Sequence, residues 1–169
     1  MDPFSITVGA VSLADVCWRL IKFLRDIPAA IASVHKEIET LASEVESLRS
    51  IVASVQECLH DNHANPAVAS SPLKAANLET LWKNCKRSLD TCQDVTTQLE
   101  YLVQEIYGKA ASNVGGKLDG LSKESRRRDK AADVQRLRDK LSIEKENLQI
   151  LLTGISLLVP QISNYFRGC

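Results

Sequence analysis

The sequence predicts an all-α protein, an antiparallel bundle of about four long helices with an apolar amino-terminal helix. Apolar residues recur at spacings of three and four over long stretches, which is the helical period. The 7 glycines and 5 prolines fall mostly between these stretches, and only 5% of residues are aromatic. A β-sandwich or barrel needs frequent turns and many β-branched or aromatic strand residues. Long amphipathic helices cannot bury their stripes alone, so a closed bundle is expected.

The first helix is expected over residues 4–25. No charged residue occurs from Phe4 to Ala14. The second half is amphipathic, because Asp15, Arg19 and Lys22 share one face. The first half is apolar all round, so it must be buried by the rest of the chain, by a partner or by lipid. The three charges inside this stretch make it a poor constitutive membrane span.

The second helix is expected over residues 28–60. Asp26 suits a helix cap, and Pro28 suits the first turn. Its apolar residues alternate spacings of three and four without a break, which is a heptad seam. A sustained seam of this kind packs inside a bundle or forms an intermolecular coiled coil. The seam consists of Ile31, Val34, Ile38, Leu41, Val45, Leu48, Val52, Val55 and Leu59.

Two further helices are expected over residues 73–107 and 123–159, with loops at 61–72 and 108–120. The third helix carries Leu78, Leu81, Cys85, Leu89, Cys92, Val95, Leu99, Leu102 and Ile106, widened by Trp82 and Val103. The fourth carries Val134, Leu137, Leu141, Leu148, Leu151, Leu152, Ile155 and Leu158. Its charged first turns are expected to project from the bundle, and Pro160 ends it. Residues 1–160 therefore form one domain, and 161–169 form a tail or the start of a linker.

Charge is balanced overall, with 21 basic and 21 acidic residues, but it is uneven along the chain. Acidic residues dominate 26–61, and basic residues dominate 117–140. Either the two helices are neighbours that neutralise each other, or the basic stretch contacts anionic lipid at about 1 kcal/mol per cation. The cations of the second interpretation are Lys123, Arg126, Arg127, Arg128 and Lys130. Nucleic acid is not expected, because the arginine run is short and has no interleaved aromatic residues.

No catalytic or metal-binding constellation is evident, so we expect neither an enzyme nor a cofactor. The carboxylate pairs Glu37/Glu39 and Glu44/Glu46 lie outside the apolar seam and are expected to be solvated. Cys58, His60, Asp61 and His63 are zinc-type ligands, but their spacing is not that of a zinc site. The 5 cysteines are odd in number and indicate reduced thiols in the cytoplasm.

The amino-terminal residues resemble the start of fungal STAND and NLR-like receptors, which often begin Met-Asp-Pro-Leu/Phe-Ser-Ile/Val. The match consists of Met1-Asp2-Pro3-Phe4-Ser5-Ile6-Thr7-Val8-Gly9-Ala10-Val11-Ser12-Leu13. The spacing of Ile38, Leu41, Glu44, Val45 and Leu48 is similar too, as is the basic-then-leucine segment 134–152. Together these residues resemble the HeLo-like domain that stands at the amino terminus of such receptors.

The resemblance implies a helical bundle related to that of mixed-lineage kinase domain-like protein, and a role in programmed cell death. Such domains oligomerise on activation and attack the membrane with an apolar amino-terminal segment. By position, that segment corresponds here to Phe4, Ile6, Val8, Val11 and Leu13. The implied partners are further copies of the chain, an anionic membrane, and an NLR-type partner or carboxy-terminal module. The domain is therefore either excised from a receptor or solitary, and it moves from the cytoplasm to the membrane on activation.

Two functions from different classes follow. The first is a membrane-targeting effector domain, in which the bundle hides the first helix until an activating event releases it. The second is a helical protein–protein interaction or dimerisation module without membrane activity. In the second case the apolar first helix is simply part of the core.

Overall fold

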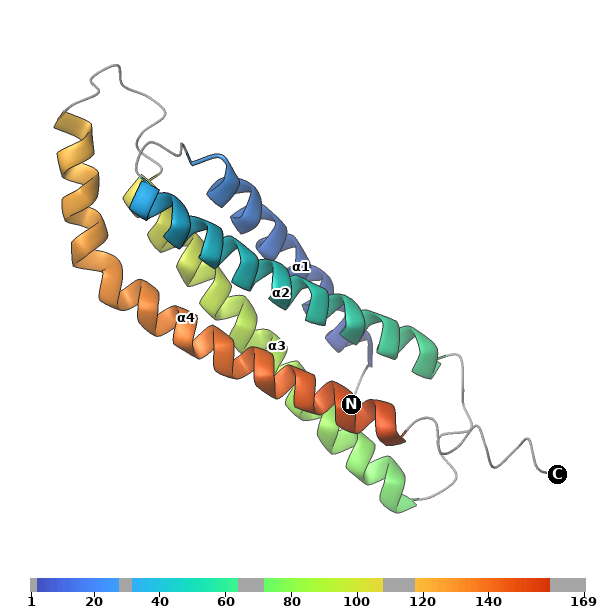
Figure 1. The fold of residues 1–169 in the computed structure, drawn as a ribbon. Coiled ribbons are helices and arrows are strands. Elements are labelled where there is room, and N and C mark those ends of the chain that lie inside the picture. Colours follow the sequence, from blue (N-terminus) through green and yellow to red (C-terminus); the bar gives the residue numbers. More distant parts are fainter. Residues whose placement is uncertain (1–2, 28–31, 64–71, 108–117, 159–169) are drawn as a thin grey trace.

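The computed structural model describes residues 3–27, 32–63, 72–107 and 118–158; at the ends of some helices it describes the backbone alone. It contains the helices α1 (Pro3–Arg25), α2 (Ala32–His63), α3 (Pro72–Tyr107) and α4 (Leu118–Leu158) (Figure 1). No described residue belongs to a β-strand. The expected all-α bundle of four helices is confirmed. Pro160, the tail 161–169 and the seam residue Ile31 lie outside the described residues.

Several helix boundaries differ from the sequence-based expectation: α2 continues to His63, into the loop expected at 61–72, and α3 already begins at Pro72. The loop expected at 108–120 overlaps α4, which already begins at Leu118 and includes Gly120. Glycine disfavours a helix interior by about 1 kcal/mol. Gly120, however, lies in the first turn of α4, where the backbone N–H groups have no intrahelical partner, so glycine disturbs the helix less there. Figure 1 shows that the first part of α4 leans away from the axis of the remainder. These charged turns nevertheless stay in contact with the bundle, because Arg127 reaches α2 and Lys130 reaches α3.

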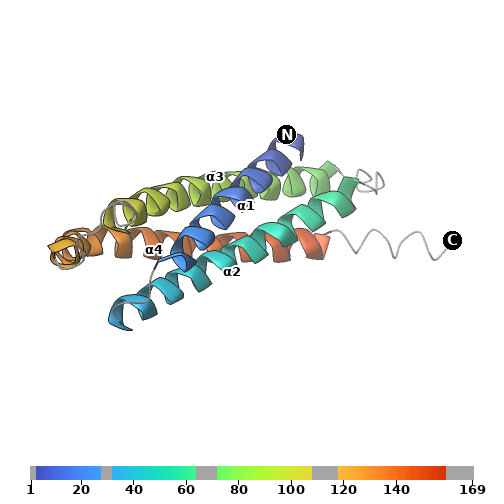
Figure 2. The same cartoon turned by 90° about the horizontal axis from the view of Figure 1, so that it is seen from above.

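The helices are arranged so that α1 and α4 lie on opposite sides of the pair α2 and α3. α1 packs against both α2 and α3, and α4 packs against the same two helices. Figure 2 shows α1 crossing the other helices on one face of the bundle. α1 and α3 run in one direction, and α2 and α4 run in the other (Figure 1). The start of α1 and the end of α4 therefore lie at the same end of the bundle.

The core is built from the heptad seams. On α2 and α3, every described seam residue from Ile38 to Leu59 and from Cys85 to Leu99 is buried. α1 contributes a seam of its own, which also alternates spacings of four and three. It consists of Ile6, Ala10, Leu13, Cys17, Leu20 and Leu24, all at most 1% exposed. This alternation lets one stripe of α1 fill the groove between α2 and α3.

α4 has the weakest apolar stripe. Leu137, Leu141, Leu148 and Ile155 are buried, while Val134, Leu151 and Leu152 pack on the core from its edge. α2 and α4 are the neighbouring pair that packs least closely. Two ion pairs join them instead, from Arg138 to Glu44 and from Arg127 to Glu37.

Leu48→Ala tests the seam. Leu48 is fully buried in α2, so its truncation leaves a cavity and should lower the free energy of unfolding by about 2–5 kcal/mol. The matched control is Ile150→Ala, which removes a similar side chain that is 69% exposed on α4. The control should change stability by less than about 0.5 kcal/mol. Urea unfolding followed by circular dichroism measures both, and equal losses would contradict the assigned core.

Candidate functional site

The first half of α1 carries apolar residues on two faces, and these faces have different environments. Ile6 and Leu13 lie in the core at 1% and 0% exposure. Val8 and Val11 point outward and are 51% and 55% exposed. The side chain of Phe4 lies outside the described residues. Of the five residues expected to enter lipid or an oligomer, two therefore stabilise the folded bundle and two are available on its surface.

Polar contacts along α1 join it to both neighbours. Gln93 Nε2 of α3 donates a hydrogen bond of 2.9 Å to Ser12 Oγ. Further along, Arg19 pairs with Asp15 at 2.7 Å and lies 3.4 Å from Glu100 of α3.

The second half of α1 is also tied to α2. The guanidinium of Arg49 lies 5.5 Å from the centroid of the Trp18 ring, which is a favourable cation–π distance. Arg25, near the end of α1, forms an ion pair with Glu46. These contacts hold the part of α1 that carries its charges.

The basic start of α4 is paired with acidic groups. Arg127 Nη1 donates to both carboxylate oxygens of Glu37, at 2.9 and 3.0 Å. Arg127 and Arg128 also share Glu124, each at 3.0 Å. These hydrogen bonds, with Glu124 and then Glu37, raise the pKa of Arg127. The same arginines, Arg127 first, hold the pKa of Glu124 below its usual value.

The remaining expected lipid contacts are also engaged. Lys130 Nζ lies 3.4 Å from a carboxylate oxygen of Glu105, and Arg126 donates to the Glu105 carbonyl at 3.4 Å. The side chain of Lys123 lies outside the described residues. The acidic start of α2 and the basic start of α4 are thus neighbours that neutralise each other. Arg128 nevertheless remains 76% exposed and presents its charge to the surface.

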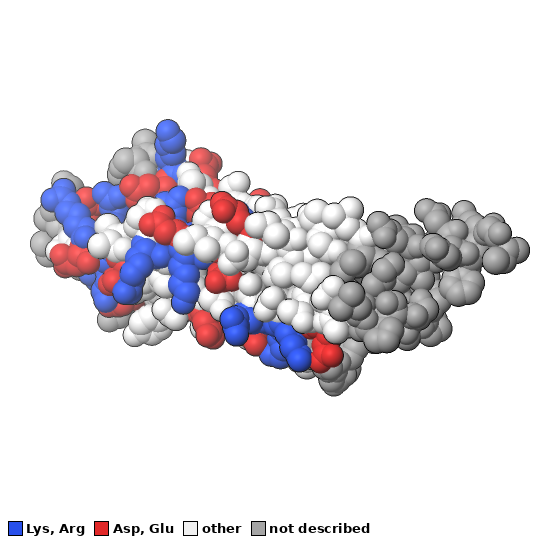
Figure 3. All heavy atoms as spheres, turned by 90° about the horizontal axis from the view of Figure 1, so that it is seen from below, with Lys and Arg blue, Asp and Glu red and all other residues white. Residues whose placement is uncertain are grey.

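On the face drawn in Figure 3, most charged side chains lie toward one end of the molecule. Figure 3, seen from the side opposite Figure 2, shows Lys, Arg, Asp and Glu crowded at the end where α4 begins. A broad uncharged area follows toward the other end. α4 contributes to it, because no residue of 147–158 carries a charge. The exposed large apolar residues described on α4 are Ile143, Ile150 and Leu157, which are spaced seven residues apart.

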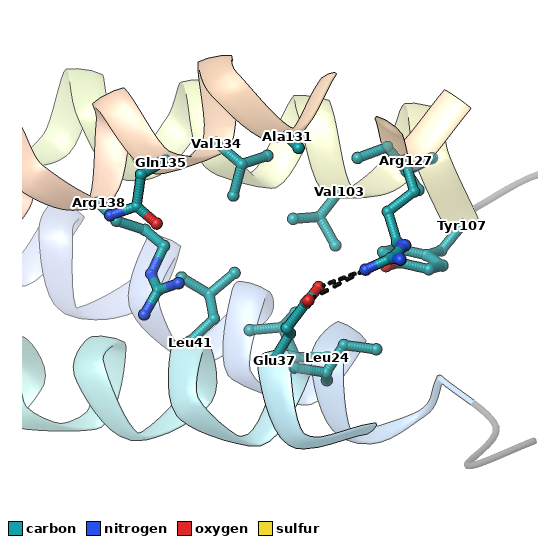
Figure 4. Close-up of a pocket in the computed structure, with 12 residues that line it drawn as sticks. Leu24, Glu37, Leu41, Val103, Tyr107, Arg127, Ala131, Val134, Gln135 and Arg138 are labelled. Atoms are coloured by element: carbon teal, nitrogen blue, oxygen red, sulfur yellow. Dashed lines mark hydrogen bonds and ion pairs between the residues drawn. The ribbon is translucent and has the colours of Figure 1, made fainter. Parts of the chain in front are cut away.

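A cavity of about 210 Å³ opens at the charged end, between all four helices. Figure 4 shows its apolar walls, which include Leu24, Leu41 and Val103, and the Arg127–Glu37 ion pair at its opening. We call it the end cavity. The sequence pattern does not single out its other rim residues, Arg138 and Tyr107. Only the opposite charge of segments 26–61 and 117–140 points toward this part of the fold.

Among the carboxylates, Glu37 is exposed as expected, although it pairs with Arg127, whereas Glu44 is only 33% exposed and pairs with Arg138. Arg138 donates to both oxygens of Glu44, at 2.9 and 2.5 Å. This bidentate geometry is the stronger kind of ion pair. Hydrogen bonding to Glu44 raises the pKa of Arg138.

The described residues contain no group of three His, Cys, Asp or Glu side chains arranged to hold a metal ion. The side chains of Asp61 and His63 lie outside them. Cys58 Sγ lies 3.9 Å from Ser156 Oγ, where α2 meets the end of α4. In the part of the chain described, no helix combines the length and apolarity needed to cross a bilayer.

The fold defines a class, the all-α four-helix bundles. Comparison with protein-family models, with curated proteins and with solved structures finds no match to this chain.

The buried cysteines give a pH prediction. Burial raises the pKa of Cys17, Cys85 and Cys92 to about 12, from 9.0. Because the folded pKa lies above the unfolded one, their contribution to stability is complete below pH 9 and is lost as pH rises toward 12. At pH 8 these thiols should resist iodoacetamide in the native protein and react in urea, as mass spectrometry can follow. Half-buried Cys58 is the internal control, and equal labelling of all four would contradict this.

Proposed function

We propose that the chain is a non-enzymatic signalling and effector domain that targets membranes through its apolar amino-terminal helix. It acts in the manner of the HeLo-like domains of fungal NLR-like receptors, by oligomerising and inducing cell death. The activating event, in this proposal, turns α1 out of the bundle so that several copies insert together.

The observation that carries this proposal is the two-sided first half of α1. A helix that served the core alone would need only the buried stripe that includes Ile6 and Leu13. The outward residues Val8 and Val11 add nothing to that core, and a polar residue there would suit water better. Apolar residues on both faces suit a helix that is surrounded by hydrocarbon in a second state.

The energies of the two states are comparable. Removing Ile6 and Leu13 from the core costs about 1.5–3 kcal/mol for each large side chain, and lipid returns a similar amount. Val8 and Val11 are exposed in the bundle, so burial of their side chains contributes favourable free energy only in the lipid-inserted state. Because a domain has only about 5–15 kcal/mol of stability, this difference is large enough to bias a switch. A trigger is still needed, since α1 also fills the groove between α2 and α3.

The geometry of the bundle supports a role for the basic segment in this switch. The start of α1 and the start of α4 lie at opposite ends of the bundle (Figure 1). The end of α1 lies close to the start of α4, at the charged end. If α1 rotates outward about its carboxy-terminal end, that end remains next to the basic residues at the start of α4. The exposed Arg128, with Lys123, Arg126, Arg127 and Lys130, can then contact anionic headgroups at about 1 kcal/mol per nearby cation.

The double variant Val8→Asp/Val11→Asp tests this proposal. Both positions are exposed in the bundle, so the folded state should keep its melting temperature within a few degrees. Each aspartate costs about 2.5–3.5 kcal/mol at the centre of a membrane helix. Leakage from anionic vesicles should therefore fall at least tenfold. This variant is more informative than deletion of residues 1–14, which would also remove core residues Ile6 and Leu13.

The matched control is Ile143→Asp/Ile150→Asp, which places two charges on exposed apolar positions of α4. It should leave leakage unchanged. If wild-type protein causes no leakage, or if the α1 variant leaks as the wild type does, the membrane proposal is wrong.

A second candidate function is a helical interaction module without membrane activity. The observation that favours it is the exposed series Ile143, Ile150 and Leu157, whose spacing matches one position of a heptad. In that case light scattering should show a defined dimer that Ile143→Asp/Ile150→Asp dissociates. Anionic vesicles should then bind neither protein.

A further inference from the structure

The end cavity has the features of a binding site for a small amphiphile. Its walls come from all four helices and are largely aliphatic, including Leu24, Ile38, Leu41, Val103 and Val134. An aliphatic cavity of about 150 Å³ is enough to bind benzene. At about 210 Å³, the end cavity is larger. It can therefore accept an alkyl chain of roughly six to eight carbons.

Two arginines line the opening of the cavity, and each is also held by a carboxylate that is about one third exposed, Glu124 for Arg127 and Glu44 for Arg138. The side chains of Arg127 and Arg138 are only 24% and 22% exposed, and both line the cavity. In Figure 4, Arg127 and Arg138 lie at opposite ends of the row of lining residues from α4, with Ala131 and Val134 between them. Glu37, by contrast, is 58% exposed. Glu37 is thus the more exposed of the two carboxylates that bind Arg127.

This asymmetry allows exchange. A surface ion pair contributes little, because its carboxylate is almost as well solvated in water. A ligand anion can therefore take the place of Glu37 on Arg127 Nη1 while Glu37 turns into solvent. The alkyl chain of the same ligand would be buried against the aliphatic walls, which contributes a gain that Glu37 cannot make.

We propose that the end cavity binds a medium-chain alkyl anion, such as a carboxylate, with its head on Arg127 and its chain between the four helices. The site needs no movement of α1, although it shares Arg127 with the headgroup contacts of the proposed membrane function. Bound ligand replaces the Glu37–Arg127 link between α2 and α4, the neighbouring pair that packs least closely.

Sodium octanoate is the probe, titrated below its micelle concentration into the ¹⁵N-labelled full chain. Saturable chemical-shift changes are expected at backbone amides of the residues that line the end cavity. Butyrate, which lacks four methylene groups, should bind at least about tenfold more weakly. Octanol, which has the chain without the charge, should also bind more weakly than octanoate. The absence of saturable shifts at these residues, or equal binding of octanol and octanoate, would overturn the proposal.

Glu37→Gln gives the sharpest variant, because the expected result is a gain. The substitution removes the competing carboxylate, so octanoate should bind up to about fivefold more tightly. General damage to the fold would not produce a gain. The matched control is Glu39→Gln, also on α2, whose carboxylate pairs with His35 rather than with α4. It should leave affinity unchanged, and unchanged or weaker binding by Glu37→Gln would contradict the exchange.

Filling the cavity tests the apolar part of the site. Val134→Phe places a ring in the chain-binding space and should weaken octanoate binding at least tenfold. Ala131→Leu, at an exposed position on the cavity rim, is a second filling variant that leaves the core untouched. Melting temperatures establish that each variant is folded. If Val134→Phe and Ala131→Leu are both folded and both bind octanoate as tightly as the wild type, octanoate binds elsewhere and the proposed site is wrong.

Discussion

The groove between α2 and α3 must be filled, and α1 fills it with a single stripe of apolar residues. α1 and α4 lie on opposite sides of this pair, so each of them holds α2 and α3 together. α1 does so with a regular buried seam from Ile6 to Leu24. α4 does so with a weaker stripe and relies on the Arg127–Glu37 and Arg138–Glu44 pairs for its link to α2. Each of the other features depends on this division between apolar and ionic packing.

The same division separates the two ends of the molecule. Where α4 begins, ion pairs replace close apolar packing, and the helices leave the end cavity between them. Where α4 ends and α1 begins, neither helix carries a charge, and the surface is uncharged over a broad area. At the end where α4 begins, surface ion pairs can be replaced by contacts with water or with dissolved anions at little cost in free energy. The other end exposes the apolar residues Val8, Val11 and Leu157, which suit contact with hydrocarbon or with another copy, beside the α3 ion pairs Lys83–Glu79 and Lys86–Asp90.

The number and the buried faces of the helices could be predicted because heptad periodicity is a local property of the chain. Leu48, Cys85 and Leu89 are buried as their spacing requires. The order of the helices around the core could not be predicted, since equivalent seams fit together in several orders. For the same reason the pairing of Glu37 with Arg127 was visible only as complementary charge on two segments. The end cavity depends on how the helices diverge, and no local pattern encodes that.

The most direct test is to tether α1 in place. Ser12 and Gln93 are hydrogen-bonded between α1 and α3 at 2.9 Å. Both can be replaced by cysteine in a protein that lacks Cys58 and Cys169, and then bridged with a short reducible crosslinker. The remaining native cysteines are buried. Our account expects the bridged protein to stay folded but not to permeabilise anionic vesicles, and reduction of the bridge to restore leakage. Leakage by the bridged protein, equal to that after reduction, would show that α1 need not leave the bundle and would contradict the account.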